Sequence, residues 1–130
     1  MPEQGKNGRG VTRLNANDEA LSPWTAMPLV GDILDGEPEE RFHRVFETII
    51  PSATEVRAGV WEATRYSEKL TDYPYNEIVF VVEGSISIIN SEGEESLFSS
   101  GDCFFLEKGF NGIWKQHETI KIFHMTVDPK

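Results

Sequence analysis

The chain has 130 residues, with 12 Lys or Arg against 22 Asp or Glu, and its formal net charge is −10 at pH 7. This length suits one domain with one core, for which eight Phe, three Trp and three Tyr supply bulky side chains. The acidic balance argues against nucleic acid and anionic membranes as partners, because both are bound by clustered Lys and Arg.

The sequence also indicates a cellular compartment. No apolar run approaches the roughly 18 residues of a membrane span, and the N-terminus lacks the apolar core of a signal peptide. Cys103 is the only cysteine, so an internal disulfide is excluded and a reducing compartment is favoured. We therefore expect a cytoplasmic protein.

Residues 1–20 are polar, with three glycines among the first ten, which predicts a flexible N-terminal tail. A single domain is then expected over residues 21–130. It begins with an arm or short strand that contains Trp24, Met27, Leu29 and Val30. Turn-forming residues follow at Gly31-Asp32 and at positions 35–38.

Long strands come next. Residues 41–50 are rich in Phe and β-branched side chains, which predicts a strand that Pro51-Ser52 ends. Residues 54–66 predict two short strands or one bent strand, because Gly59 interrupts them.

From residue 78 onward, short strands alternate with glycine turns. Residues 78–82 are apolar at every position and 103–106 are mostly apolar, which predicts two buried strands, the first covered on both faces. Further strands are predicted at 85–89, 95–98, 113–115 and 119–127. No stretch shows sustained helical periodicity, and strands about ten residues apart indicate a sandwich or barrel.

The glycine positions resemble the two halves of the cupin signature. Glu77 and Gly84 match its first half, and Gly101 and Gly109 match its second half. Gly84 and Gly101 fall where tight turns need a positive φ, which glycine adopts without a Cβ clash. By this resemblance, Gly112 occupies the position of a metal-binding histidine, and the usual His-x-His pair before Glu77 is absent.

A larger set of motifs over residues 24–127 resembles the small cupins grouped with the ureidoglycine aminohydrolase cupin domain and with ethanolamine-utilisation cupins. These motifs are Gly59-Val60-Trp61-Glu62, Glu77-x6-Gly84, Gly101-Asp102 and Gly109-Phe110-x-Gly112-x-Trp114. The resemblance implies an all-β, RmlC-like jelly roll, a double-stranded β-helix barrel that is often a homodimer.

The resemblance places Glu77 in the barrel lumen, where a carboxylate could act as a catalytic acid or base, bind a metal or orient a substrate amine. The alternative is a rim residue paired with Lys or Arg. Trp61 and Trp114 are expected either to wall a ligand pocket or to fill the core. Tyr66, Tyr73 and Tyr75 are expected near the mouth, as ligand contacts or as solvent-facing loop residues.

Lys121 and Glu62 complete the candidate ligand-binding residues, with a Lys121–Glu62 or Lys121–Glu77 ion pair as the alternative. No cofactor is predicted, because the three histidines lack metal-ligand spacing. A divalent metal held by Glu77, His124 and a third donor such as Glu62 is the weaker alternative.

Two further residue groups are given structural roles. Cys103 lies in an apolar strand, which predicts a buried and inert thiol. The acidic segments 37–40 and 92–95 predict solvated turns.

Three functions remain open at this point. The leading hypothesis is a cupin that binds a small polar molecule without the histidine-based metal site. The second is an enzyme that uses Glu77 on a ureido-, amino- or sugar-type substrate. The third is a ligand-free structural dimer in which the arm of Trp24, Met27 and Leu29 exchanges between subunits.

Overall fold

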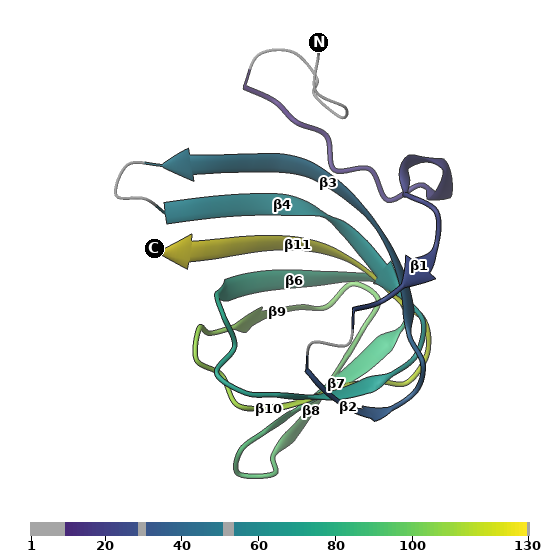
Figure 1. Ribbon diagram of the computed structural model, residues 1–130, viewed down its shortest axis with the longest axis vertical. Helices are drawn as coiled ribbons and strands as arrows, with labels where there is room; N and C mark the ends of the chain where they lie inside the picture. The colour runs from purple at the N-terminus through teal and green to yellow at the C-terminus, as the bar shows by residue number, and fades with distance from the viewer. Residues whose placement is uncertain (1–9, 29–30, 51–53, 130) are drawn as a thin grey trace.

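Two antiparallel sheets face each other in the structure, a computed structural model that describes residues 10–28, 31–50 and 54–129 (Figure 1). In these ranges one sheet has six strands in the order β1-β3-β4-β11-β6-β9, and the other has five in the order β2-β5-β10-β7-β8. The elements are η1 (Asp18–Ala20), β1 (Thr25–Ala26), β2 (Asp32–Asp35), β3 (Glu39–Ile50), β4 (Thr54–Ala63), β5 (Ser67–Leu70), β6 (Asn76–Glu83), β7 (Ser85–Asn90), β8 (Glu95–Ser99), β9 (Cys103–Leu106), β10 (Gly112–Gln116) and β11 (Ile120–Pro129). The predicted all-β jelly-roll barrel is confirmed.

The chain passes from one sheet to the other several times, and this crossing encloses the core. Strands β6 and β7 belong to different sheets although only Gly84 separates them. Gly84 has a φ of 92° and Gly101 a φ of 96°, which confirms the predicted glycine turns. At Gly84 an added Cβ would also press on the carbonyl oxygen of Thr119. Glycine is therefore needed there both for its backbone angle and for its small size.

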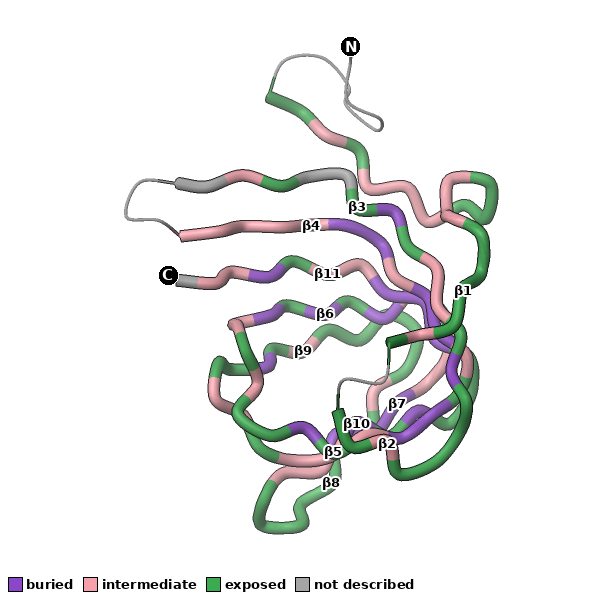
Figure 2. Tube along the Cα trace, in the orientation of Figure 1, coloured by how far each residue is buried: buried purple, intermediate pink, exposed green. Residues whose placement is uncertain are grey.

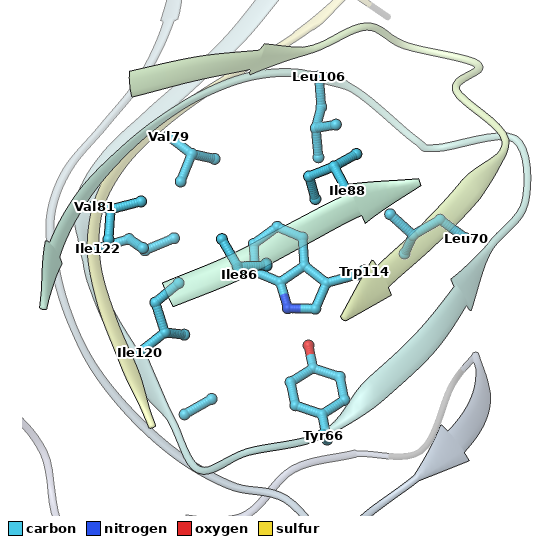
Figure 3. Packing of buried hydrophobic residues seen from close by; sticks show 11 residues of the cluster. Tyr66, Leu70, Val79, Val81, Ile86, Ile88, Leu106, Trp114, Ile120 and Ile122 are labelled. Carbon is cyan, nitrogen blue, oxygen red and sulfur yellow. The ribbon is translucent and has the colours of Figure 1, made fainter. Parts of the chain in front are cut away.

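The hydrophobic core lies between the sheets, and Figure 3 shows its side chains pointing inward from the strands. Leu70 comes from β5, Val79 from β6, Ile88 from β7 and Trp114 from β10. Along β6, buried and exposed residues alternate (Figure 2), as the two-residue period of a strand requires.

This alternation corrects the prediction that residues 78–82 are covered on both faces. Ile78 and Phe80 point outward, and each is 39% exposed. The prediction for residues 103–106 was wrong in the same way, because Cys103 is exposed and Phe105 is 54% exposed. An apolar run does not reveal whether anything covers the second face of its sheet.

These outward side chains line up across three neighbouring strands. Met125, Ile78 and Phe105 form one cross-strand row. A second row contains Phe123, Phe80 and Cys103. We call these six residues the outer patch.

Of the two alternatives for residues 54–66, two short strands or one strand, the structure has one strand, β4, with Gly59 inside it and opposite the bulge between Arg44 and Phe46 of β3. Two other local predictions differ from the structure. The predicted turn at Gly31-Asp32 was wrong for Asp32, which begins β2 and pairs with β5. Residues 64–66 leave the extended conformation before β5, a strand that the sequence did not predict.

The expected arm packs on its own chain where it is described. Thr25 and Ala26 pair with β3, the Trp24 ring lies 4.7 Å from the Arg41 guanidinium carbon, and Met27 packs against the core. Leu29, Val30, Pro51 and Ser52 lie outside the described residues, as does the tail up to residue 9.

Candidate functional site

A pocket of about 300 Å³ lies between the two sheets. Its volume is at the lower end of the range for small-molecule sites, roughly 300–1,000 Å³. Six aromatic side chains line it: Phe42, Trp61, Tyr66, Tyr73, Tyr75 and Trp114. Besides the three tyrosines, its titratable lining residues are Glu40, Glu68, Glu77, Arg44 and His124.

Strand register explains why these side chains meet. Trp61 of β4 pairs with Ile122 of β11, and His124 follows two residues later on the same face. On the next strand, Val79 pairs with His124, and Glu77 follows at the same two-residue interval. The pocket face of the six-stranded sheet therefore carries Trp61, His124 and Glu77 together.

Glu77 is only 7% exposed, and two polar side chains contact its carboxylate. The Tyr73 hydroxyl donates a hydrogen bond to Oε1, and Nδ1 of His124 lies 3.3 Å from Oε2. Burial, followed by the charge of Glu77, raises the pKa of Tyr73, so this phenol stays neutral and keeps its donor proton. The His124 contact lacks hydrogen-bond geometry, and its strength therefore depends on the charge of the ring.

The aromatic rings meet at steep angles. Trp61 lies 6.0 Å from Trp114 with 72° between the ring planes, and 6.5 Å from Tyr66 with 80° between them. Figure 3 shows the Tyr66 hydroxyl pointing toward the Trp114 indole. Both indole donors are engaged within the protein, Trp61 Nε1 with Glu40 at 2.9 Å and Trp114 Nε1 with Gln116 at 3.0 Å. The rings consequently offer aromatic surface to a ligand rather than hydrogen-bond donors.

Glu62 and Lys121, which the sequence suggested as ligand-binding residues, do not line this pocket. Glu62 lies on the opposite face of the sheet from Trp61 and accepts a hydrogen bond from Nε of Arg41 at 2.7 Å. Nζ of Lys121 donates to the Ala16 carbonyl at 2.8 Å and to Asp18 at 2.9 Å. The hydrogen bond and charge of Lys121, followed by the charge of Arg41, lower the pKa of Asp18.

Several lining residues were not predicted from the sequence. Glu40 was predicted in a solvated turn, but it lies in β3, lines the pocket and accepts a hydrogen bond from the Trp61 indole. Phe42 and Arg44 follow Glu40 at two-residue intervals, and this alternation along a predicted strand was the available signal. Glu68 carried no such signal, because its strand, β5, was not predicted.

The side chains that the structure describes do not fit the histidine-bound metal that the cupin resemblance implies. No group of three or more His, Cys, Asp or Glu side chains in these ranges is arranged to hold a metal ion. Gly112 supplies no ligand, and a Cβ there would lie 2.6 Å from the Phe110 ring and press on the Ile89 carbonyl. Glu77 and His124 are two donors, and Glu62, the suggested third, lies on the other face of the sheet.

The other two histidines lie away from the pocket. His43 is buried on the outer face, where neither ring nitrogen has a hydrogen-bond partner among the described residues. His117 is exposed, and its Nε2 lies 2.8 Å from the Ser87 hydroxyl.

Two antiparallel sheets around an aromatic pocket place the protein among the jelly-roll barrels, the fold class to which cupins belong. The family model of the EutQ-like cupin domain matches residues 52–122, more than half of the chain, so the chain belongs to this family. No curated protein sequence matches significantly. Within the described residues, no helix is long and apolar enough to cross a membrane.

Solved structures support the fold. A DUF861-family protein of unknown function from Pseudomonas syringae pv. tomato has a TM-score of 0.76 at 21% identity, over 95% of this chain and 51% of that one. The present chain thus spans about half the length of that relative. The EutQ protein of Clostridium difficile has a TM-score of 0.58 at 24% identity, over 76% of this chain and 78% of that one. Ectoine synthase from P. lautus has a TM-score of 0.54 at 17% identity, over 75% of this chain and 69% of that one. At these identities the similarity shows the fold alone.

Proposed function

We propose that this cupin binds a small polar molecule in the pocket between its sheets, without a histidine-based metal site. The observation that carries the proposal is a buried carboxylate, Glu77, in an open pocket lined by six aromatic rings. A buried carboxylate is costly unless it is well paired. Glu77 has a neutral phenol and one imidazole contact, which leaves acceptor capacity for a ligand.

The open volume favours this role over core packing alone. Rings that only filled the barrel would close the space between them, because protein interiors are close-packed. Here Trp61 and Trp114 instead border a pocket of about 300 Å³.

Glu62 provides a matched control for testing the proposal. It is as buried as Glu77, each being 7% exposed, but it lies outside the pocket. We expect a thermal-shift panel of neutral, anionic and cationic small molecules to yield a stabilising ligand. Glu77→Gln should weaken the response to that ligand, whereas Glu62→Gln should keep it. A panel without a ligand, or equal responses from both variants, would contradict the proposal.

The second proposal is catalysis on a ureido-, amino- or sugar-type substrate. It is favoured by the contact series Tyr73–Glu77–His124, in which a carboxylate touches two groups that can carry protons. Once a substrate is identified, Glu77→Gln should reduce turnover by about 10²-fold or more. Unchanged turnover would remove Glu77 from the acid–base role.

We further propose a cytoplasmic homodimer. The lone cysteine supports a reducing compartment, and the outer patch supports self-association, because exposed apolar surface of this kind commonly marks an interface. In the alternative, an exchanged arm, Trp24 and Met27 would leave the contacts that they make with their own chain.

A further inference from the structure

The charges around the pocket indicate what kind of ligand it takes. Three carboxylates, from Glu40, Glu68 and Glu77, line it against one guanidinium, from Arg44. The lining therefore carries a formal charge of −2 when His124 is neutral and −1 when it is protonated. Arg44 is exposed, with its guanidinium carbon 5.8 Å from the Phe42 ring. Burial and then the charge of Glu77 raise the pKa of the lining residue Tyr75, and the charges of Arg57 and Arg44 oppose this rise.

No Lys or Arg within the described ranges forms an ion pair with any of these three carboxylates. Glu40 accepts from the neutral Trp61 indole, and Glu77 accepts from the neutral Tyr73 phenol. The outer-face Glu62, by contrast, is paired with Arg41. The pocket thus holds three carboxylates that no Lys or Arg of the described residues pairs with directly.

The pKa of Tyr66, a phenol in the same pocket, also responds to these carboxylates. Burial, and then the charges of Glu68, Glu40 and Glu77, raise the pKa of Tyr66. These three carboxylates come from β5, β3 and β6 and act on one hydroxyl. The three carboxylates therefore disfavour added negative charge at this hydroxyl, whereas burial, the larger cause, disfavours a charge of either sign.

The aromatic rings favour the same sign of charge. The face of an aromatic ring attracts cations, and its edge repels them. Trp61 stands nearly perpendicular to both Trp114 and Tyr66, and all three rings line the pocket. The indole N–H groups, which are the positive edges, are turned to Glu40 and Gln116.

We propose that the ligand is a small organic cation, a primary or quaternary alkylammonium, held between these ring faces and the three carboxylates. This inference rests on the proposed function, because it assigns a ligand class to the same pocket. The volume suits a compact head group with a short chain.

Isothermal titration with isosteric probes at constant ionic strength tests the charge directly. Choline is compared with the neutral 3,3-dimethylbutan-1-ol and the anionic 3,3-dimethylbutanoate, and butylammonium is compared with butan-1-ol. We expect each cation to bind about tenfold or more tightly than its neutral counterpart, and the carboxylate to bind weakest. Glu68→Gln should reduce the cation preference, and Glu62→Gln should leave it unchanged.

The possible failures are distinguishable. If a neutral or anionic probe binds as tightly as the cations, the ligand class is wrong but binding in the pocket stands. The same holds if no cation binds while the thermal-shift panel yields a ligand of another class. If neither the cations nor any panel member binds, both the ligand class and the proposed function fall.

Discussion

Two buried glutamates show how the surroundings separate a candidate site residue from a structural one. Glu62 accepts from the Arg41 guanidinium and joins a network with Asp18 and Lys121. Glu77 has the same exposure but contacts a phenol and an imidazole beside an open pocket. An ion-paired carboxylate such as Glu62 stabilises the fold. A buried carboxylate without a Lys or Arg partner, such as Glu77, is more often part of a functional site.

Replacing the phenol tests how far Glu77 depends on it. Tyr73→Phe removes the donor to a buried carboxylate and should lower the free energy of unfolding by about 1–3 kcal/mol. Tyr66→Phe is the control, because Tyr66 is a buried tyrosine whose hydroxyl has no hydrogen bond to a described residue. Urea denaturation at pH 7 measures both. Equal losses in the two variants would show that the Tyr73 bond contributes little.

Glu68 gives the pocket a predictable pH dependence. Burial, and then the charge of Asp32, raise the pKa of Glu68 above 4.5. A carboxyl with a raised folded-state pKa contributes most stability below its unfolded value, and this contribution is lost as pH rises through the folded value. Glu68→Gln should therefore stabilise the protein at pH 7 by up to about 1 kcal/mol.

The same substitution should have a smaller effect on stability as the pH falls well below 4.5, where the folded and unfolded states both hold the proton. Denaturation curves of the wild type and Glu68→Gln across pH 3.5–7.5 measure this difference. If Glu68→Gln stabilises the protein most at the acidic end of this range, the pKa of Glu68 is not raised in the folded state.

At the scale of single elements, β10 shows why a metal-site histidine does not fit this barrel. A Cβ at Gly112 would meet the Phe110 ring and the Ile89 carbonyl, and the carbonyl cannot move without disturbing the β7–β10 pairing. Gly112→Ala should therefore lower the free energy of unfolding by about 1–3 kcal/mol. Gly112→His should cost at least as much and should not restore metal binding.

Denaturation and elemental analysis of the purified Gly112→His variant check this expectation, with the wild type as the reference. A variant that is as stable as the wild type and holds stoichiometric divalent metal would show that the barrel still accommodates the family's centre.

The elements also show what could be predicted from sequence. Strand alternation and glycine turns indicated a sandwich or barrel, and the resemblance to small cupins implied the jelly roll. The same resemblance implied a position in the barrel lumen for Glu77, whereas Trp61 and Trp114 were left open between pocket wall and core packing. Glu62 was misplaced because adjacency to Trp61 in the sequence puts it on the opposite face of the strand. β5 was missed because Ser67-Glu68-Lys69-Leu70 has little strand character of its own and is extended through its pairing with β2 and β10.

For the whole molecule, the outer patch predicts self-association. Phe105→Glu should convert a dimer into a monomer of 14.7 kDa without loss of fold, because this side chain is 54% exposed. Leu97→Glu is the matched control, since Leu97 is 64% exposed but lies on β8 of the other sheet. Light scattering coupled to gel filtration distinguishes the states. A monomeric wild type, or a dimer that survives Phe105→Glu, would exclude the outer patch as the interface.

The reactivity of the Cys103 thiol is an independent test of whether the outer patch is an interface. It is exposed in the single chain and shares a cross-strand row with Phe80. Its thiol should therefore react slowly with a thiol reagent in the dimer and at least tenfold faster in Phe105→Glu, as burial in an interface blocks access. Equal rates in the two proteins would place Cys103 outside any interface.

The most direct measurement of ligand binding uses the three tryptophans in a nitrogen-15 NMR titration with choline and butylammonium. Trp61 and Trp114 border the pocket, whereas Trp24 lies over Arg41 on the outside and serves as an internal control. Binding between the sheets should shift the indole N–H signals of Trp61 and Trp114 saturably and leave that of Trp24 in place. Three unmoved signals, or a shift of Trp24 alone, would contradict a cation site in this barrel.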